Sequence, residues 1–278
     1  MNILEFSLLI CMGSFIAGFL GALTGLGGGV VIVPLLTSVF GVDIRYAIGA
    51  SLVSVIATSC AAASTYIKKG YTNLRLGMFL EVATIAGALI GALVASFISI
   101  KALTVILALV LLYSAYLSGQ PRIEDTDDKS PDPLASDLRL NSTYPTPEGL
   151  MAYQVHSVPV GFCIMLIAGV LSGLLGIGSG AFKVLAMDQA MGLPFKVSTS
   201  TSNFMIGVTA AASAGVYLAW GYIEPGVTMP VMLGVLPGAL LGARVLVGAK
   251  TQTLRIIFCF VLAAMALKMI YNSLAGGF

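Results

Sequence analysis

Long apolar segments follow one another along most of this chain, and they limit the available folds more than any other feature. They lie at roughly 6–24, 29–40, 46–67, 75–97 and 101–118, and then at roughly 158–175, 180–191, 197–219, 227–248 and 253–274. Charged residues make up 9% of the 278 residues, whereas soluble domains are about one quarter charged. Long apolar runs that must satisfy their own backbone hydrogen bonds in lipid favour helices over the short alternating strands of a barrel. The sequence predicts an all-α, polytopic helical membrane protein.

A polar stretch at roughly 119–148 separates the two groups of apolar segments. Of the chain's 14 basic and 12 acidic side chains taken together, 10 lie in this stretch, which is also rich in proline. A segment of this composition buries too little apolar surface to fold alone, so we interpret it as a solvated, flexible loop. The chain then divides into a first membrane repeat (1–118), a polar linker loop (119–148) and a second membrane repeat (149–278).

The two groups of apolar segments are copies of each other. An offset of 151 residues pairs Ala17-Gly18 with Ala168-Gly169, the Gly-x-Gly-x-Gly of 25–29 with that of 176–180, the Tyr-x3-Gly-Tyr of 66–71 with that of 217–222, and the glycine-rich run 87–92 with 238–243. Apolar bias alone does not align glycines and tyrosines in this way. The match indicates an internal duplication.

The charges of equivalent loops indicate that the two copies have opposite orientations. Loop 68–75 carries three basic residues, whereas its partner at 219–226 carries only Glu224. The positive-inside rule therefore places the two loops on opposite sides, with 68–75 and the central loop in the cytoplasm. Inverted repeats need an odd number of crossings in each half. A re-entrant hairpin before three crossings satisfies this, as do five crossings with one short or broken helix.

Each copy contains a glycine-rich turn inside a continuous apolar run, at 24–29 and at 175–180. Glycine costs about 1 kcal/mol in a helix interior, so several together predict unwound backbone, which at membrane depth is tolerated only inside protein or along a cavity. Paired interruptions in inverted halves point to a transporter's binding site. The alternative is that the glycines only let helices pack closely. We expect substrate contacts from Gly27, Gly28, Gly29, Gly178, Ser179 and Gly180.

These residues also resemble the signature of a known family. Gly25 to Gly29 with Pro34 downstream, followed by Gly49-Ala50-Ser51-Leu52, is similar to the first repeat of the TauE/SafE family, and Gly176 to Gly180 followed by Lys196 to Asn203 is similar to its second repeat. The resemblance covers nearly the whole chain apart from the polar loop, with Leu185 as a departure at the position of Pro34. It implies a multi-pass protein of the cytoplasmic (inner) membrane that moves sulfite, sulfoacetate and related organosulfur anions, often outward. The signature identifies the scaffold better than the substrate.

One basic residue lies in the apolar sequence where charge is costly. Lys183 follows the second glycine turn, whereas its counterpart in the first copy is Ile32. An ammonium at mid-membrane costs at least about 2.5–3.5 kcal/mol, so it should face a cavity or a partner. A helix beginning at Gly180 would direct its free N–H groups to the same place. We therefore predict that Lys183 binds a sulfonate or sulfite oxygen; the alternative is a structural ion pair with Asp188, the nearest acid in the sequence.

A run of six small polar residues, from Ser198 to Asn203, enters the next apolar segment. Such hydroxyls can bind an oxyanion, and they also serve commonly as interhelical hydrogen-bond donors. We favour Ser202 and Asn203 as substrate ligands, together with Ser51, which matches Ser202 in the first copy.

Two acidic residues are candidates for a coupling ion, either H⁺ or Na⁺. Glu81 lies about six residues into its segment, and Asp188 follows Lys183. Glu81 is equally placed to extend toward the cytoplasmic face and pair near Lys68, Lys69 or Arg75.

The function we predict is a secondary carrier for a small anion, in which one repeat rocks against the other around a central site. A passive anion channel would use the same residues. An intramembrane enzyme with Ser179 as nucleophile and His156 as base is disfavoured, because Ser179 matches Gly28 in the other copy. We expect no cofactor, resident metal or nucleic-acid partner; the expected partners are the anion, the lipid bilayer and a coupling ion. The sequence does not indicate the oligomeric state.

Overall fold

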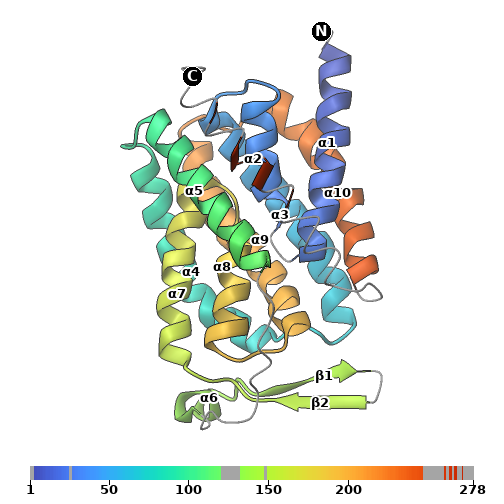
Figure 1. The fold of residues 1–278 in the computed structure, drawn as a ribbon, viewed down its shortest axis with the longest axis vertical. Helices are drawn as coiled ribbons and strands as arrows, with labels where there is room; N and C mark the ends of the chain where they lie inside the picture. The colour runs from blue at the N-terminus through green and yellow to red at the C-terminus, as the bar shows by residue number, and fades with distance from the viewer. Residues whose placement is uncertain are drawn as a thin grey trace.

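A computed structural model describes residues 3–24, 27–119, 132–146 and 149–246, together with six single residues between 260 and 271. In chain order its elements are the helices α1 (Ile3–Thr24), α2 (Gly29–Ser38), α3 (Ile44–Lys68), α4 (Leu74–Ala95), α5 (Ile100–Gly119) and α6 (Pro133–Asp137), the strands β1 (Ser142–Thr146) and β2 (Gly149–Tyr153), the helices α7 (Val158–Leu175) and α8 (Gly180–Leu185), the π-helical segment η1 (Ala186–Ala190), and the helices α9 (Phe195–Ala219) and α10 (Pro225–Leu246) (Figure 1). The predicted apolar segment 253–274 lies almost entirely outside the described residues.

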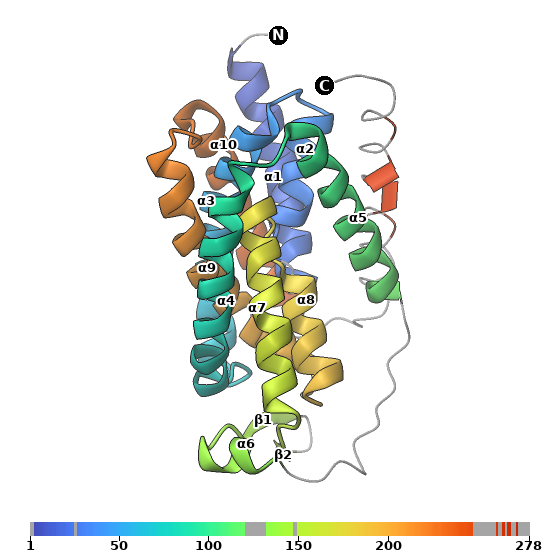
Figure 2. The ribbon, with the colours of Figure 1, turned by 90° about the vertical axis from the view of Figure 1, so that its left-hand side faces the viewer.

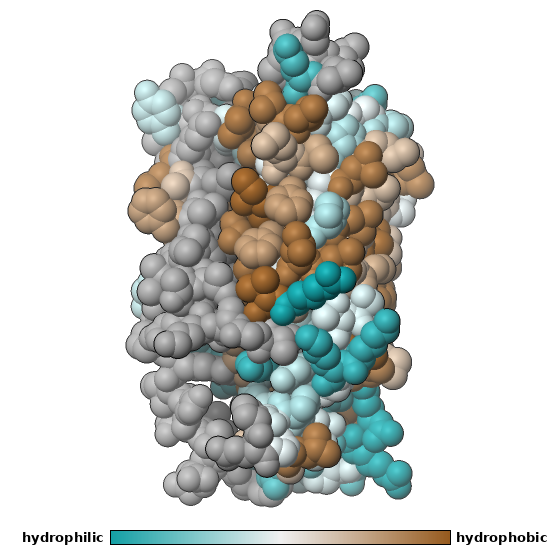
Figure 3. Space-filling model, turned by 90° about the vertical axis from the view of Figure 1, so that its right-hand side faces the viewer, coloured by the Kyte–Doolittle hydropathy of each residue, from teal (hydrophilic) through white to brown (hydrophobic). Residues whose placement is uncertain are grey.

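Six helices, α1, α3, α4, α7, α9 and α10, are long and apolar enough to cross a membrane. Large apolar side chains on them are more than half exposed, among them Met12, Val82, Leu93, Ile167 and Leu233. Figure 3 shows a broad apolar area over the upper and middle parts of one face, with hydrophilic side chains gathered toward the lower end. Lipid accepts such a surface, and the helices satisfy their own backbone groups within it. The prediction of a polytopic helical membrane protein is confirmed.

Helices from the two halves pack against each other in matching pairs. α1 packs along α10, and α4 packs along α7 (Figures 1 and 2). Glycines allow these close approaches: a Cβ atom on Gly18 would lie 2.5 Å from the carbonyl oxygen of Val235, and one on Gly169 would lie 2.3 Å from that of Thr84. The 151-residue offset relates the two contacts, because it pairs Gly18 with Gly169 and Thr84 with Val235. The duplicated sequence therefore builds duplicated contacts.

Each half begins with a helical hairpin. In the first hairpin, Phe6 of α1 meets Phe40, which follows α2, with ring centroids 5.5 Å apart. In the second hairpin, the N–H of His156, ahead of α7, donates a 3.0 Å hydrogen bond to the carbonyl of Met191, which follows η1. Both hairpins thus return to the level at which they start. Because α1 and α7 are also long and apolar enough to cross a membrane, the re-entrant hairpin and the broken spanning helix both stay predictions.

The two hairpins run in opposite directions. α1 begins at the upper end of the molecule, and α7 begins at the lower end beside the strands (Figures 1 and 2). Equivalent cation–aromatic contacts also occur in both halves: Arg45 lies 5.7 Å from the centre of the Tyr222 ring, and Lys196 lies 5.9 Å from that of Tyr71. Inverted repeats require such an arrangement, and the assignment of the two ends to sides of a membrane stays a prediction.

The second part of the central polar stretch is ordered, so the expectation of a flexible loop is wrong for residues 132–146. Asp132 accepts hydrogen bonds from backbone N–H groups at the starts of both α6 and α7. β1 and β2 form an antiparallel pair. The side chain of Asn73, ahead of α4, donates to the Leu140 carbonyl at 2.8 Å and to the Tyr153 hydroxyl at 2.9 Å. Polar side chains that satisfy neighbouring backbone hold this segment against the helices, a role that composition does not reveal.

Candidate functional site: two glycine turns beside a buried ion pair

The two glycine turns meet between α3 and α9. A Cβ atom on Gly27 would lie 2.9 Å from the side chain of Ile206, and one on Gly178 would lie 2.7 Å from it. Both positions are also within 4 Å of the Val55 side chain. Val55 and Ile206 are equivalent residues of the two copies, since the 151-residue offset relates them. The turns thus converge on the place where the two halves face each other.

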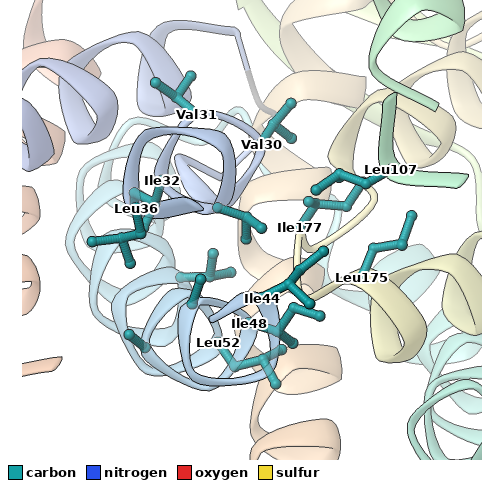
Figure 4. Packing of buried hydrophobic residues seen from close by; sticks show 14 of the residues in the cluster. Val30, Val31, Ile32, Leu36, Ile44, Ile48, Leu52, Leu107, Leu175 and Ile177 are labelled. Atoms are coloured by element: carbon teal, nitrogen blue, oxygen red, sulfur yellow. The ribbon is translucent and has the colours of Figure 1, made fainter. Parts of the chain in front are cut away.

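The first half contacts the second glycine turn directly. Ser51 Oγ of α3 donates a 2.7 Å hydrogen bond to the Gly176 carbonyl. A Cβ atom on Gly29 would lie 2.7 Å from Ser51 Oγ and 3.0 Å from the Gly176 carbonyl oxygen. Figure 4 shows Ile177 of this turn in an apolar cluster built largely by α2, α3 and α5. Two of the predicted ligands, Gly29 and Ser51, therefore lie together at the second turn.

Several residues of the turns have the left-handed backbone conformation. The φ angles are 74° at Gly27, 57° at Gly28 and 72° at Gly178, a region that glycine enters at low cost. Ser179 also has a positive φ of 45°, which is unusual for a residue with a side chain. Its Oγ donates a hydrogen bond to the Ala168 carbonyl of α7. The Ser179 hydroxyl thus joins the two arms of the second hairpin.

Lys183 of α8 is fully buried within a group of polar side chains. Its Nζ donates to Thr209 Oγ1 of α9 at 2.5 Å, and Thr209 Oγ1 lies 2.5 Å from Glu81 Oε1 of α4. The direct distance from Lys183 Nζ to Glu81 Oε2 is 3.9 Å. Thr84 Oγ1 lies 3.4 Å from Thr209 Oγ1. Of the basic residues that the structure describes, Lys183 alone is buried, and it faces a carboxylate from the first half.

This ion pair differs from the pairs that the sequence suggests. Sequence distance offers Asp188 as the partner of Lys183, and the loop 68–75 as the partner region of Glu81. The structure pairs Lys183 with Glu81 instead, because α4 of the first half packs against α7 and α9 of the second. Glu81 is 5% exposed, so it does not extend to the interface. Asp188 lies half-buried in η1.

The polar run at the start of α9 divides between the turn and interhelical contacts. Ser202 Oγ donates to the Gly180 carbonyl at 3.4 Å, which places it at the second glycine turn. The Asn203 amide donates to the Thr199 carbonyl of its own helix at 3.1 Å. Two other side chains of the run, Ser200 and Thr201, bind the backbone of loop 71–73. The structure therefore brings Ser202, but not the Asn203 amide, to the turn.

Thr209 is the residue of this site that sequence reasoning misses. It links Lys183 to Glu81 although it lies in an apolar part of α9. One signal was available, because the 151-residue offset matches Thr209 with Thr58 and a hydroxyl repeated in both copies is unexpected there. No pattern in the sequence connects Thr209 with Glu81.

The symmetry-related positions carry no charged side chain. Ile32, Thr58 and Met232 occupy the positions that match Lys183, Thr209 and Glu81. Ile32 is fully buried, and Met232 is half-buried. Thr58 Oγ1 donates to the Ser54 carbonyl of its own helix at 3.0 Å. Of the two equivalent sets of positions, each shared between the halves, one thus carries a charged group of side chains and the other an uncharged group.

The chain matches the family described as "Sulfite exporter TauE/SafE" over residues 10–269. It is 28% identical over 281 residues to "Probable membrane transporter protein YunE" of Bacillus subtilis, with 98% of this chain and 99% of that relative covered. It is 26% identical over 238 residues to "Probable membrane transporter protein YdhB" of the same organism (85% and 89% covered), and 26% identical over 278 residues to "Probable membrane transporter protein MJ0441" of Methanocaldococcus jannaschii (95% and 94% covered). No solved structure matches it significantly. Because the family match extends over both halves and the site between them, the chain belongs to the TauE/SafE family and is a membrane transporter, not an enzyme.

Proposed function

We propose that this transporter is a secondary carrier that exports small sulfur-containing anions, such as sulfite or organosulfonates, across the cytoplasmic membrane. The observation that carries the proposal is the burial of a cation, Lys183, in α8, the short helix that follows the second glycine turn. Sulfite and sulfonate oxygens accept charge-assisted hydrogen bonds from an ammonium. The description of the family supports this class of anion.

The proposed binding site lies between Lys183 and the meeting point of the glycine turns. Ser51 of α3 and Ser202 of α9 are equivalent residues of the two copies. In the structure, each donates a hydrogen bond to a carbonyl of the second glycine turn. A bound anion would take over such donors. The proposed ligand set contains these two serines and Lys183, with backbone or hydroxyl groups of Gly27, Gly28, Gly29, Gly178, Ser179 and Gly180; Asn203 is left out, because its amide donates to its own helix.

Alternating access follows from the duplicated packing. The two hairpins meet at Val55 and Ile206 and run in opposite directions, so rocking one repeat against the other would expose this point to each side in turn. Loop 68–75 and the central stretch would lie on the cytoplasmic side.

A thermal-shift panel on the purified protein tests the proposal. We expect sulfite, thiosulfate or sulfoacetate to raise the melting temperature, because a ligand that binds the folded state stabilises it. Sulfate, taurine and carboxylates without sulfur complete the panel. Lys183→Gln should abolish the shift, whereas Lys101→Gln, at an exposed position of α5, should retain it. An equal shift in wild type and Lys183→Gln would overturn the proposed site.

Flux measurements separate a carrier from a passive anion channel. A carrier reconstituted in proteoliposomes saturates with thiosulfate and accelerates labelled thiosulfate uptake when unlabelled thiosulfate is present on the opposite side. Linear flux without this countertransport would instead indicate a channel that uses the same residues.

A further inference from the structure

We propose that each transported anion is accompanied by one proton, which binds to the Glu81 carboxylate when the anion binds to Lys183. This inference rests on the proposed function and names its coupling ion. It is carried by the contact chain from Lys183 Nζ through Thr209 Oγ1 to Glu81 Oε1.

In the structure, the buried charges compensate each other. Lys183 is 0% exposed and Glu81 is 5% exposed, and their charged atoms lie 3.9 Å apart. Glu81 Oε1 accepts the Thr209 hydroxyl, and among the described residues Glu81 Oε2 has no hydrogen-bond partner. Isolated buried charges are costly, whereas a compensated pair is tolerated. The empty site is therefore neutral overall.

Anion binding changes this balance. An anion that takes Lys183 as its counter-charge leaves the Glu81 carboxylate buried without compensation. Uptake of one proton from water by Glu81 removes that charge, and the protonated carboxyl can still hydrogen-bond to Thr209. No covalent bond other than this O–H bond forms or breaks. By reciprocity, anion binding then favours protonation of Glu81 and protonation favours anion binding to the same extent.

The surroundings of Glu81 favour a proton over Na⁺. A Na⁺ ion at the carboxylate would lie beside the Lys183 ammonium, and like charges at such a short distance repel. Neutral oxygens nearby include those of Thr209 and Thr84 and the Met205 carbonyl, which accepts from Thr209 Oγ1 at 3.0 Å. Lys183 is the charged group that faces Glu81 in the structure. The other titratable side chains of the surrounding second-half elements are Cys163 on α7, Asp188 on η1, and Lys196 and Tyr217 on α9.

The wild-type protein provides the first test. Thiosulfate and sulfoacetate are suitable probes, because their charges do not change near neutral pH. Where Glu81 is ionised in the empty protein and protonated in the loaded one, their affinity should fall about tenfold for each unit of rising pH. In proteoliposomes held at zero membrane potential, an inward thiosulfate gradient should acidify the lumen, as reported by an enclosed pH-sensitive dye.

Variants then assign the proton to Glu81. Glu81→Gln keeps an acceptor for Thr209, and we expect it to bind thiosulfate with no pH dependence and to move no protons. Glu81→Asp should keep the proton movement. Met232→Gln, the matched change at the equivalent position of the other half, should retain the wild-type pH dependence.

The outcomes distinguish this inference from the proposed function. If neither probe binds or is transported, the proposed function fails, and the inference fails with it. If the probes are bound and transported by wild type without pH dependence or luminal acidification, proton coupling alone is overturned. Proton movement that persists in Glu81→Gln would overturn the assignment to Glu81.

Discussion

The two halves of this transporter share a backbone design but differ at one pair of equivalent sites. In one site, Lys183 contacts Thr209, which contacts Glu81. In the other, Ile32 and Met232 take the places of the two charged residues. The glycine contacts between helices are by contrast duplicated in both halves.

This difference distinguishes the residues that helix packing requires from the residues that are specific to one site. Contacts that occur twice, such as Gly18 on Val235 and Gly169 on Thr84, serve helix packing. A buried ion pair that occurs at one of two equivalent sets of positions is not required by the symmetric fold. We therefore attribute Lys183 and Glu81 to substrate and proton binding, and the comparison between the halves becomes experimentally testable.

The largest effect should come from separating the charged pair. Glu81→Leu or Lys183→Met alone should lower the free energy of unfolding by about 3–5 kcal/mol, because each leaves one buried charge unpaired. The double variant Lys183→Met/Glu81→Leu should recover most of the loss. Ile32→Met and Met232→Leu, the changes at the uncharged equivalent positions, should cost less than about 1.5 kcal/mol. Thermal unfolding in detergent measures these losses of stability. Equal losses at the charged positions and at their uncharged equivalents would contradict a special role for the ion pair.

Helix packing should instead respond equally in both halves. A Cβ atom on Gly87 would lie 2.2 Å from the Leu166 carbonyl oxygen, and one on Gly238 would lie 2.1 Å from that of Phe15. Gly87→Ala and Gly238→Ala should each destabilise the protein by about 1–3 kcal/mol through overpacking. Gly215→Ala is the control, since its Cβ would meet no atom within 4 Å, and alanine there should be neutral or stabilising. A large effect in only one half would contradict duplicated packing.

The threonine pair offers a smaller contrast. Thr209→Val removes the hydroxyl between Lys183 and Glu81 and should cost about 1–3 kcal/mol, because charged partners lose a buried hydrogen bond. Thr58→Val removes a bond to its own helix and should cost about 1 kcal/mol or less. Melting curves of the two variants side by side test this order, and a reversed order would exclude Thr209 as the link.

The smallest effects should come from the cation–aromatic contacts at the two ends. Arg45→Ala and Lys196→Ala each remove a cation from a tyrosine face, which is worth about 0.5–1 kcal/mol at partly exposed sites. Similar small changes in melting temperature are expected for both. A change several times larger for one of them would show that the ends are not equivalent in energy.

Much of the scaffold was predictable from the sequence, because its determinants are local. Apolar length predicts the spanning helices, and aligned glycines predict the hairpin turns and the paired contacts. The contact between Phe6 of α1 and Phe40 after α2 was not predictable, since it depends on how the two helices fold back on each other.

The site was predictable only in part. Lys183 stands out as a charge in apolar sequence, but its partner depends on tertiary packing between the halves. Glu81 lies far from Lys183 in sequence, and it reaches Lys183 because α4 packs against helices of the other copy. The ordered segment 132–146 was also missed, since the side chain of Asn73 that holds it belongs to another part of the chain. Local patterns do not encode such long-range hydrogen bonds.

The most direct measurement is thiosulfate and sulfoacetate binding to wild type and to Lys183→Met/Glu81→Leu, with Ile32→Met/Met232→Leu as the matched control. Both double variants keep the protein free of unpaired buried charge, so loss of binding would not reflect unfolding. We predict that Lys183→Met/Glu81→Leu loses binding, whereas Ile32→Met/Met232→Leu retains binding and its pH dependence. Undiminished binding by Lys183→Met/Glu81→Leu would contradict the assignment of the anion site to Lys183.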